Sequence, residues 1–243
     1  MNEIDNNEDL FGKKFEEGWK LDIPDFSGEE LRDATSEEYL VPIFAKDDET
    51  LSFRGNGVIV GSYLITAAHV AQTEHGDNNY KIIWYQYKGE LLEATDEDII
   101  HDGRNVGVID GNNDDLIIYK LKDILGSFIC NGGEIHKSME LIAYPYTNFD
   151  GKLVKSGGIC KIDSLNVESG KGDGIIWKNC FKVNYPFRCT YGNSGSAVFV
   201  KNVLYGILIE KYDIGEGAFG KVIDARYIKN IIEKYELEQL QEG

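Results

Sequence analysis

Short apolar runs separated by turn signals fill the chain from Tyr39 onward, and this texture limits the folds that the chain can adopt. The runs are rich in Val, Ile and Tyr, which are enriched in β-strands. Turn signals such as Gly111-Asn112 and Lys201-Asn202 separate them. At least eight runs are recognisable: YLVPIFA, GVIVGSYLITAA, YKIIWYQY, LIIYKL, MELIAYPY, GIIWKNCFKV, SAVFV and VLYGILI. Many short strands without long intervening helices predict an antiparallel β-barrel or sandwich.

The end of the chain is the exception, because its apolar residues follow a helical period. Asp224 is a suitable helix N-cap, and Ile228, Ile231, Ile232 and Tyr235 recur after it at helical spacing. We therefore predict a C-terminal helix over about residues 225–240 whose apolar face packs on the body.

Acidic residues outnumber basic ones, with 42 Asp and Glu against 25 Lys and Arg and a net charge of −17. Residues 1–38 alone hold 13 acidic and four basic residues. An acidic surface repels phosphate groups, so nucleic acids and anionic membranes are not expected as partners. We predict that residues 1–38 form a separate acidic N-terminal extension, partly disordered, that docks through a few aromatic side chains.

Compartment and cysteine chemistry follow from what the sequence does not contain. It has no basic start followed by an apolar stretch, and no run approaches the about 18 apolar residues of a membrane span. These features predict a cytoplasmic protein.

The cysteines show no CxxC pairing and no His at zinc spacing, so we expect free thiols, no metal and no cofactor. They are Cys130, Cys160, Cys180 and Cys189.

Three motifs carry residue types that can do chemistry. His69 closes the run ITAAHV, Asp115 leads into the apolar run LIIYKL, and Ser194 lies in GNSGSA. Taken singly, each has a structural alternative: a buried core histidine, a strand cap and a Gly-Ser turn. Glycines on both sides of Ser194 allow a sharp bend in which the amides of Gly192 and Ser194 converge on one point, as in an oxyanion hole.

Together, in the order His, Asp, Ser, the motifs resemble those of the trypsin/chymotrypsin-like serine peptidase family. Residues 203–208 resemble the strand that follows the nucleophile, and residues 217–222 resemble the closing segment. Asn193 before the serine is similar to the bacterial branch that includes glutamyl-endopeptidase-like enzymes. It stands where many relatives carry an Asp that pairs with a freed N-terminal amine, so we expect no activation of that kind. The resemblance covers about residues 39–240.

The resemblance implies an all-β fold of two antiparallel six-stranded β-barrels with the site in the cleft between them. It places the peptidase domain at residues 39–243, with lobe one at about 39–124 and lobe two at about 125–224. It implies a protein or peptide substrate, with Ser194 as nucleophile, His69 as general base and Asp115 as the residue that orients the histidine. Gly192 and Ser194 would form the oxyanion hole.

The resemblance also implies an unusual specificity pocket. Arg188 occupies the position six residues before the nucleophile, and Glu210 and Lys211 lie on the opposite wall. An Arg at the base would favour acidic side chains or partly fill the pocket, and we expect poor cleavage after Lys or Arg. The alternative is that a nearby acid neutralises Arg188.

Two readings other than an active serine endopeptidase remain at the level of sequence. One is a catalytically impaired, protease-like binding or scaffold module, which the odd pocket favours and the complete set of motifs opposes. The other is a β-barrel adhesin in which GNSGS is only a turn. The extension at residues 1–38 is a candidate site for a regulatory partner, because its negative charge would face a pocket that holds Arg188 and Lys211.

Overall fold

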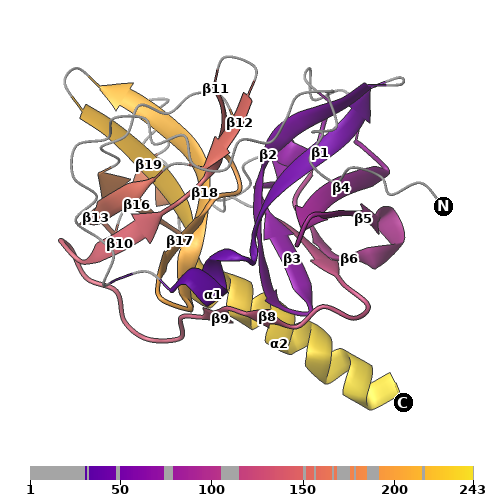
Figure 1. Ribbon diagram of the computed structural model, residues 1–243. Helices are drawn as coiled ribbons and strands as arrows, with labels where there is room; N and C mark the ends of the chain where they lie inside the picture. The colour runs from indigo at the N-terminus through magenta and orange to yellow at the C-terminus, as the bar shows by residue number, and fades with distance from the viewer. Residues whose placement is uncertain are drawn as a thin grey trace.

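Two β-sheet lobes lie side by side, and one long helix runs beneath them (Figure 1). The computed structural model describes residues 31, 33–47, 50–73, 79–104, 115–149, 152–155, 157–165, 167–168, 176–177, 179–184, 192–214 and 217–242. Antiparallel pairing dominates both lobes, as expected for short strands joined by tight turns.

Lobe one is a half-barrel. Its strands pair in the order β5-β4-β1-β2-β3-β7-β6, and β8 pairs with β2 off this path. Within the described residues the path ends at β5 and β6, which are connected by one turn of 3-10 helix, η3 (Asp96–Asp98), and not by a ladder. The strands are β1 (Leu40–Asp47), β2 (Thr50–Gly61), β3 (Tyr63–Thr66), β4 (Ile82–Tyr87), β5 (Glu90–Thr95), β6 (Ile99–Asp102), β7 (Ile117–Lys120) and β8 (Gly126–Ser127).

Lobe two is a closed six-stranded barrel. Its path runs β17-β10-β13-β16-β19-β18, and β18 pairs back with β17 to close the ring. The strands are β10 (Glu140–Ala143), β13 (Gly158–Ser164), β16 (Cys180–Asn184), β17 (Ala197–Val200), β18 (Val203–Ile214) and β19 (Gly217–Asp224). Shorter elements flank it: β9 (Ile129–Cys130), which pairs with β18, and the pairs β11 (Tyr146–Phe149) with β12 (Lys152–Lys155) and β14 (Val167–Glu168) with β15 (Ile176–Trp177).

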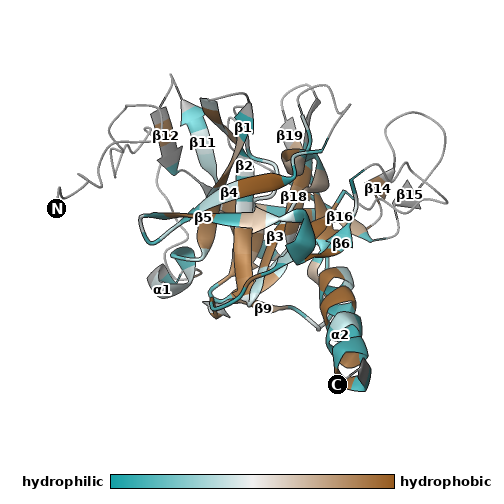
Figure 2. Ribbon diagram, turned by 90° about the vertical axis from the view of Figure 1, so that its right-hand side faces the viewer, coloured by the Kyte–Doolittle hydropathy of each residue, from teal (hydrophilic) through white to brown (hydrophobic). Residues whose placement is uncertain are grey.

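The apolar runs in the sequence become the core strands. All four residues of β3 are buried, and β13 alternates between buried and exposed positions as a half-buried strand does. Fully burying a side chain such as Leu64 or Phe181 contributes about 1.5–3 kcal/mol. Figure 2 shows this pattern as hydrophobic colouring concentrated in the interior strands.

The long apolar run at residues 57–68 is two strands and not one. Gly61 ends β2 with φ of 56° and, with Ser62, turns the chain back into β3. Glycine adopts this left-handed conformation without the steric cost that a Cβ imposes.

The C-terminal helix α2 spans Ala225–Glu242. Asp224 Oδ1 accepts the N–H of Arg226 at 2.8 Å and so caps the first turn. Ile228 and Ile232 are buried against the strands, whereas Leu237 and Leu240 near the end are exposed. No helix in the described ranges is both long and apolar enough to cross a membrane. The predicted all-β double barrel with a C-terminal helix is confirmed, with lobe one open where six closed strands were expected.

The last residues of the predicted acidic extension dock on the body. Leu31 accepts the N–H of Lys201 through its carbonyl at 2.7 Å. The short helix α1 (Ala34–Glu37) follows, capped by Asp33, and Ser36 within it is buried. Residues 1–30 lie outside the described residues, so the domain boundary at residue 38 stays a prediction.

Candidate active site

His69 and Asp115 form a two-point contact in lobe one. His69 lies on the 3-10 turn η2 (Ala68–Ala71), immediately after β3, and Asp115 precedes β7. The carboxylate accepts the backbone N–H of His69 on Oδ1 at 2.9 Å and lies 2.7 Å from the ring Nδ1 through Oδ2. Because β3 and β7 are paired neighbours, the sheet brings these two side chains together from distant parts of the sequence.

The surroundings of His69 change its pKa in opposite directions. Partial burial of the ring lowers the pKa, while the hydrogen bond and charge of Asp115 raise it, and the charge of Glu210 adds to the increase. The net result is a pKa above the ordinary value of histidine. The side chain is 44% exposed, so the ring is accessible from solvent.

The GNSGSA loop of lobe two has a backbone that only glycine can support at two positions. Gly192 has φ of 104° and Gly195 has φ of 81°. A Cβ on Gly192 would lie 2.3 Å from a ring atom of Phe53, and one on Gly195 would lie 1.9 Å from the carbonyl oxygen of Asn56. The loop is therefore packed directly against lobe one, with no room for a side chain.

Gly55 of β2 is where the serine loop and the histidine segment meet. A Cβ on Gly55 would lie 2.7 Å from the carbonyl oxygen of Ser194 and 2.8 Å from Cγ2 of Val70, the neighbour of His69. The N–H of Asn56 donates to the same Ser194 carbonyl at 2.8 Å. The structure thus places all three motifs at the junction of the lobes.

Two amide groups of the loop have no hydrogen-bond acceptor among the described residues. Within the described part of the chain, the N–H groups of Gly192 and Ser194 donate no hydrogen bond. The carbonyl of Asn193 accepts both Oγ–H and N–H of Ser196, at 2.5 and 3.2 Å. In a planar trans peptide, N–H and C=O point in opposite directions, so the N–H of Ser194 is directed away from Ser196.

The side chain of Asn193 carries an unsatisfied acceptor. Its Oδ1 is buried and has no hydrogen-bond donor among the described residues. Leaving such an acceptor unpaired costs about 1–3 kcal/mol.

Of the three predicted pocket residues, the structure describes the side chain of one. Arg188 and the side chain of Lys211 lie outside the described residues. Glu210 is paired with Lys221, whose Nζ lies 2.6 Å from its Oε2. Lys221 is only 3% exposed, and no sequence signal had marked it as a partner of Glu210.

No competing chemistry stands out elsewhere in the described residues. The three described cysteines are free, and burial raises the pKa of each thiol to about 12. No cluster of metal-ligating side chains occurs among the described residues.

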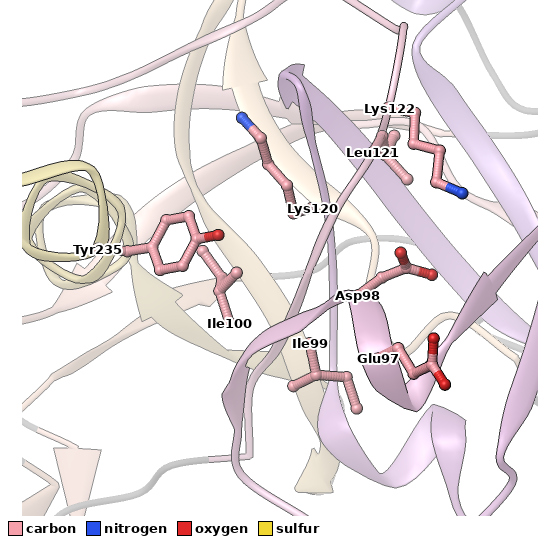
Figure 3. A pocket seen from close by; sticks show the side chains of 8 residues that line it. All are labelled: Glu97, Asp98, Ile99, Ile100, Lys120, Leu121, Lys122 and Tyr235. Carbon is pink, nitrogen blue, oxygen red and sulfur yellow. The ribbon is translucent and has the colours of Figure 1, made fainter. Parts of the chain in front are cut away.

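A separate pocket of ≈ 290 Å³ lies between η3, the end of β7 and α2, where Tyr235 points toward Ile100 and Lys120 (Figure 3). It lies at the opposite end of β7 from Asp115.

Comparison by sequence finds no matching family model and no similar curated protein. Comparison by structure finds serine proteases. The chain is similar to the Rv3671c protease of M. tuberculosis in its active form, with a TM-score of 0.61 and 13% identity over 83% of this chain and 82% of that chain. For an inactive-form serine-to-alanine mutant of Rv3671c, the TM-score is 0.56 and the identity 13%, over 86% of this chain and 91% of that chain. For kallikrein-related peptidase 10, the TM-score is 0.58 and the identity 16%, over 85% of this chain and 99% of that chain. These likenesses establish a trypsin-like serine protease fold.

Proposed function

We propose that the chain is a serine endopeptidase in which His69, Asp115 and Ser194 form the catalytic triad. The observation that carries this proposal is the two-point contact between Asp115 and His69, held beside the Ser194 loop at Gly55. A core histidine or a simple strand cap does not need both contacts. The trypsin-like fold supports the same reading.

In the proposed mechanism, Ser194 Oγ attacks the scissile carbonyl while His69 Nε2 accepts its proton. Asp115 holds the ring with Nδ1 protonated and stabilises the imidazolium that forms. The imidazolium then protonates the leaving amine, which departs and leaves an ester on Ser194. A water molecule, deprotonated by His69, hydrolyses that ester and restores the serine.

The negative charge that develops on the carbonyl oxygen would be bound by the N–H groups of Gly192 and Ser194. Each such donor contributes about 3 kcal/mol to transition-state stabilisation. Their lack of other partners in the described residues supports this role.

For specificity, we propose a preference for substrates with an acidic side chain before the cleaved bond and poor cleavage after Lys or Arg. Arg188 is one source of positive charge in this proposal, and the buried Lys221 beside Glu210 is a second. We also propose that the acidic residues 1–38 engage a regulatory partner, and that the protein acts in the cytoplasm.

Labelling with a fluorophosphonate probe tests the proposed activity. We expect the wild type to be labelled, Ser194→Ala to be unlabelled, and the control Ser62→Ala, in the turn between β2 and β3, to react as the wild type does. The wild type and Ser62→Ala should cleave a peptide library, and Ser194→Ala should not. A folded wild type that neither reacts nor cleaves would favour a protease-like scaffold module instead.

A further inference from the structure

Asn56 is a buried polar residue at the junction of the two lobes. It lies on β2, two residues after Arg54, where the β1–β2 register shifts. The residue is only 3% exposed. In the sequence it stands between two glycines, where an asparagine is typical of a turn, yet here it is part of a long strand.

The side-chain amide of Asn56 makes three hydrogen bonds, all to lobe two. Its Nδ2 donates to the carbonyl of Gly192 at 2.7 Å and to that of Tyr146 at 2.9 Å. Its Oδ1 accepts the N–H of Tyr146 at 2.6 Å. Two carbonyls on one end and an N–H on the other leave only one orientation of the amide satisfied.

The backbone of Asn56 makes one further hydrogen bond to lobe two and one within lobe one. Its N–H donates to the carbonyl of Ser194, and its carbonyl accepts Oγ–H of Thr66 at 2.5 Å. Asn56 thus holds the carbonyls at both ends of the tripeptide from Gly192 to Ser194.

These contacts hold the three peptide units that follow Gly192, Asn193 and Ser194. The unit after Gly192 is held by Nδ2 of Asn56, and the unit after Asn193 by Ser196. The unit after Ser194 is held at both ends, since its carbonyl accepts the N–H of Asn56 and the Gly195 N–H donates to the carbonyl of Leu208 at 2.7 Å. Because each unit is planar, fixing the carbonyls also fixes the N–H groups of Asn193, Ser194 and Gly195. Of these, the N–H of Ser194 is a proposed oxyanion donor, and Asn56 holds the units on both sides of the one that carries it.

We propose that Asn56 is a positioning residue of lobe one that holds the serine loop of lobe two in the conformation that presents the Ser194 amide to the oxyanion. The inference rests on the proposed peptidase function. It adds that the oxyanion-binding geometry depends on a side chain from the lobe that also carries His69 and Asp115. Releasing the carbonyl of Gly192 frees the peptide unit that precedes the one carrying the Ser194 N–H. A Ser194 amide that turns with the freed unit cannot bind the oxyanion.

Two substitutions and one control test the role. Asn56→Ala removes all three side-chain bonds. Asn56→Asp keeps the acceptor for Tyr146 but places an oxygen against two carbonyls. The control is Asn202→Ala, because Asn202 also joins the lobes through its side chain, 3.4 Å from the carbonyl of Ser127, but does so away from the loop.

For the folded fraction of each variant, kcat and KM are measured on the best library peptide. Removing an oxyanion donor lowers kcat by about 10²–10³-fold, so a displaced donor should lower kcat by about 10- to 100-fold with KM within about twofold. Asn56→Asp should lose at least as much as Asn56→Ala, and Asn202→Ala should keep the wild-type kcat. A normal kcat in folded Asn56→Ala, or an equal loss in Asn202→Ala, overturns the proposal.

Amide hydrogen exchange supplies a readout that does not need activity. The amides of residues 195–200 should exchange about tenfold faster in Asn56→Ala than in the wild type, and at the wild-type rate in Asn202→Ala. Unchanged exchange in Asn56→Ala overturns the positioning role. An inactive wild type whose exchange responds as expected overturns the peptidase proposal alone.

Discussion

The carboxylate of Asp115 binds His69 twice, once at the backbone N–H and once at ring Nδ1. The first contact fixes the position of the turn that carries the ring, and the second fixes the ring's orientation and its tautomer. One carboxylate therefore controls both the placement and the protonation of the proposed general base.

The pH dependence of activity should report this contact. The pKa of His69 is raised in the folded protein, and the base must be neutral to act, so activity should fall with acid around a midpoint above about 6.5. In Asp115→Asn that midpoint should move to lower pH, and kcat should fall by about 10⁴-fold. The kcat/KM profile is the measurement.

Glu210→Gln is the matched comparison, since the charge of Glu210 also raises the pKa of His69, by less than Asp115. It should shift the midpoint in the same direction by a smaller amount. A midpoint that is the same in Asp115→Asn as in the wild type would contradict the assignment of His69 as the titrating base.

Steric crowding at Gly195 can be separated from backbone strain by comparison with Gly89. The two residues have nearly equal φ, 81° and 83°, but a Cβ on Gly89 would meet nothing within 4 Å. Gly89→Ala should therefore cost only the left-handed strain of about 1–2 kcal/mol. Gly195→Ala should cost about 4 kcal/mol or more, because its Cβ overlaps the carbonyl of Asn56. Urea unfolding measures both, and equal costs would show that the loop is not tightly packed.

Ser196→Ala should reduce catalysis more than stability. It removes the Oγ–H bond to the carbonyl of Asn193 and leaves only the longer N–H bond. The free energy of unfolding should fall by about 1 kcal/mol. With the Ser194 amide less firmly directed, kcat should fall by about tenfold at unchanged KM. Wild-type kcat in this variant would show that the Asn193 carbonyl does not need Ser196.

Lys221→Met should alter selectivity without unfolding the protein. Removing one partner of an ion pair is costly when the charge left behind is buried, but Glu210 is 46% exposed and can be solvated without Lys221. The preference for acidic over neutral side chains should fall by about tenfold, as measured by cleavage-site profiling. Strong cleavage after Arg by the wild type would contradict the proposed specificity.

Truncation at residue 30 and truncation at residue 38 should have different effects. The longer deletion removes Leu31, whose carbonyl binds Lys201, and the buried Ser36. It should lower the melting temperature, while deletion of residues 1–30 should not. If the extension has the proposed regulatory role, deleting residues 1–30 should change peptidase turnover or partner capture. Identical turnover and partners in the shorter deletion would remove that role.

The all-β class, the terminal helix and the three motifs could be read from sequence because each depends on local signals. Runs of Val, Ile and Tyr indicate strands wherever they pack, and a period of 3.6 indicates a helix. The split of residues 57–68 into two strands was missed, because one glycine in an apolar run does not reveal its φ. The open edge of lobe one was missed too, since closure depends on pairings between distant strands.

Asn56 and Lys221 could not be predicted for a different reason. Asparagine between glycines and lysine are both usual in exposed positions, and only the tertiary structure shows that Asn56 and Lys221 are buried. Asn56 is paired with Gly192 of the other lobe and Lys221 with Glu210 of the neighbouring strand, and these polar contacts offset the cost of burial.

The open edge of the half-barrel has a consequence for how copies of the protein behave toward one another. An unpaired strand is a template for edge-to-edge association, and β5 is the last strand of the described path. β5 is short and carries Glu90 and Glu93. Two copies pairing along β5 would bring four carboxylates together, and like charges on adjacent strands repel. This repulsion disfavours pairing of two copies along the open β5 edge.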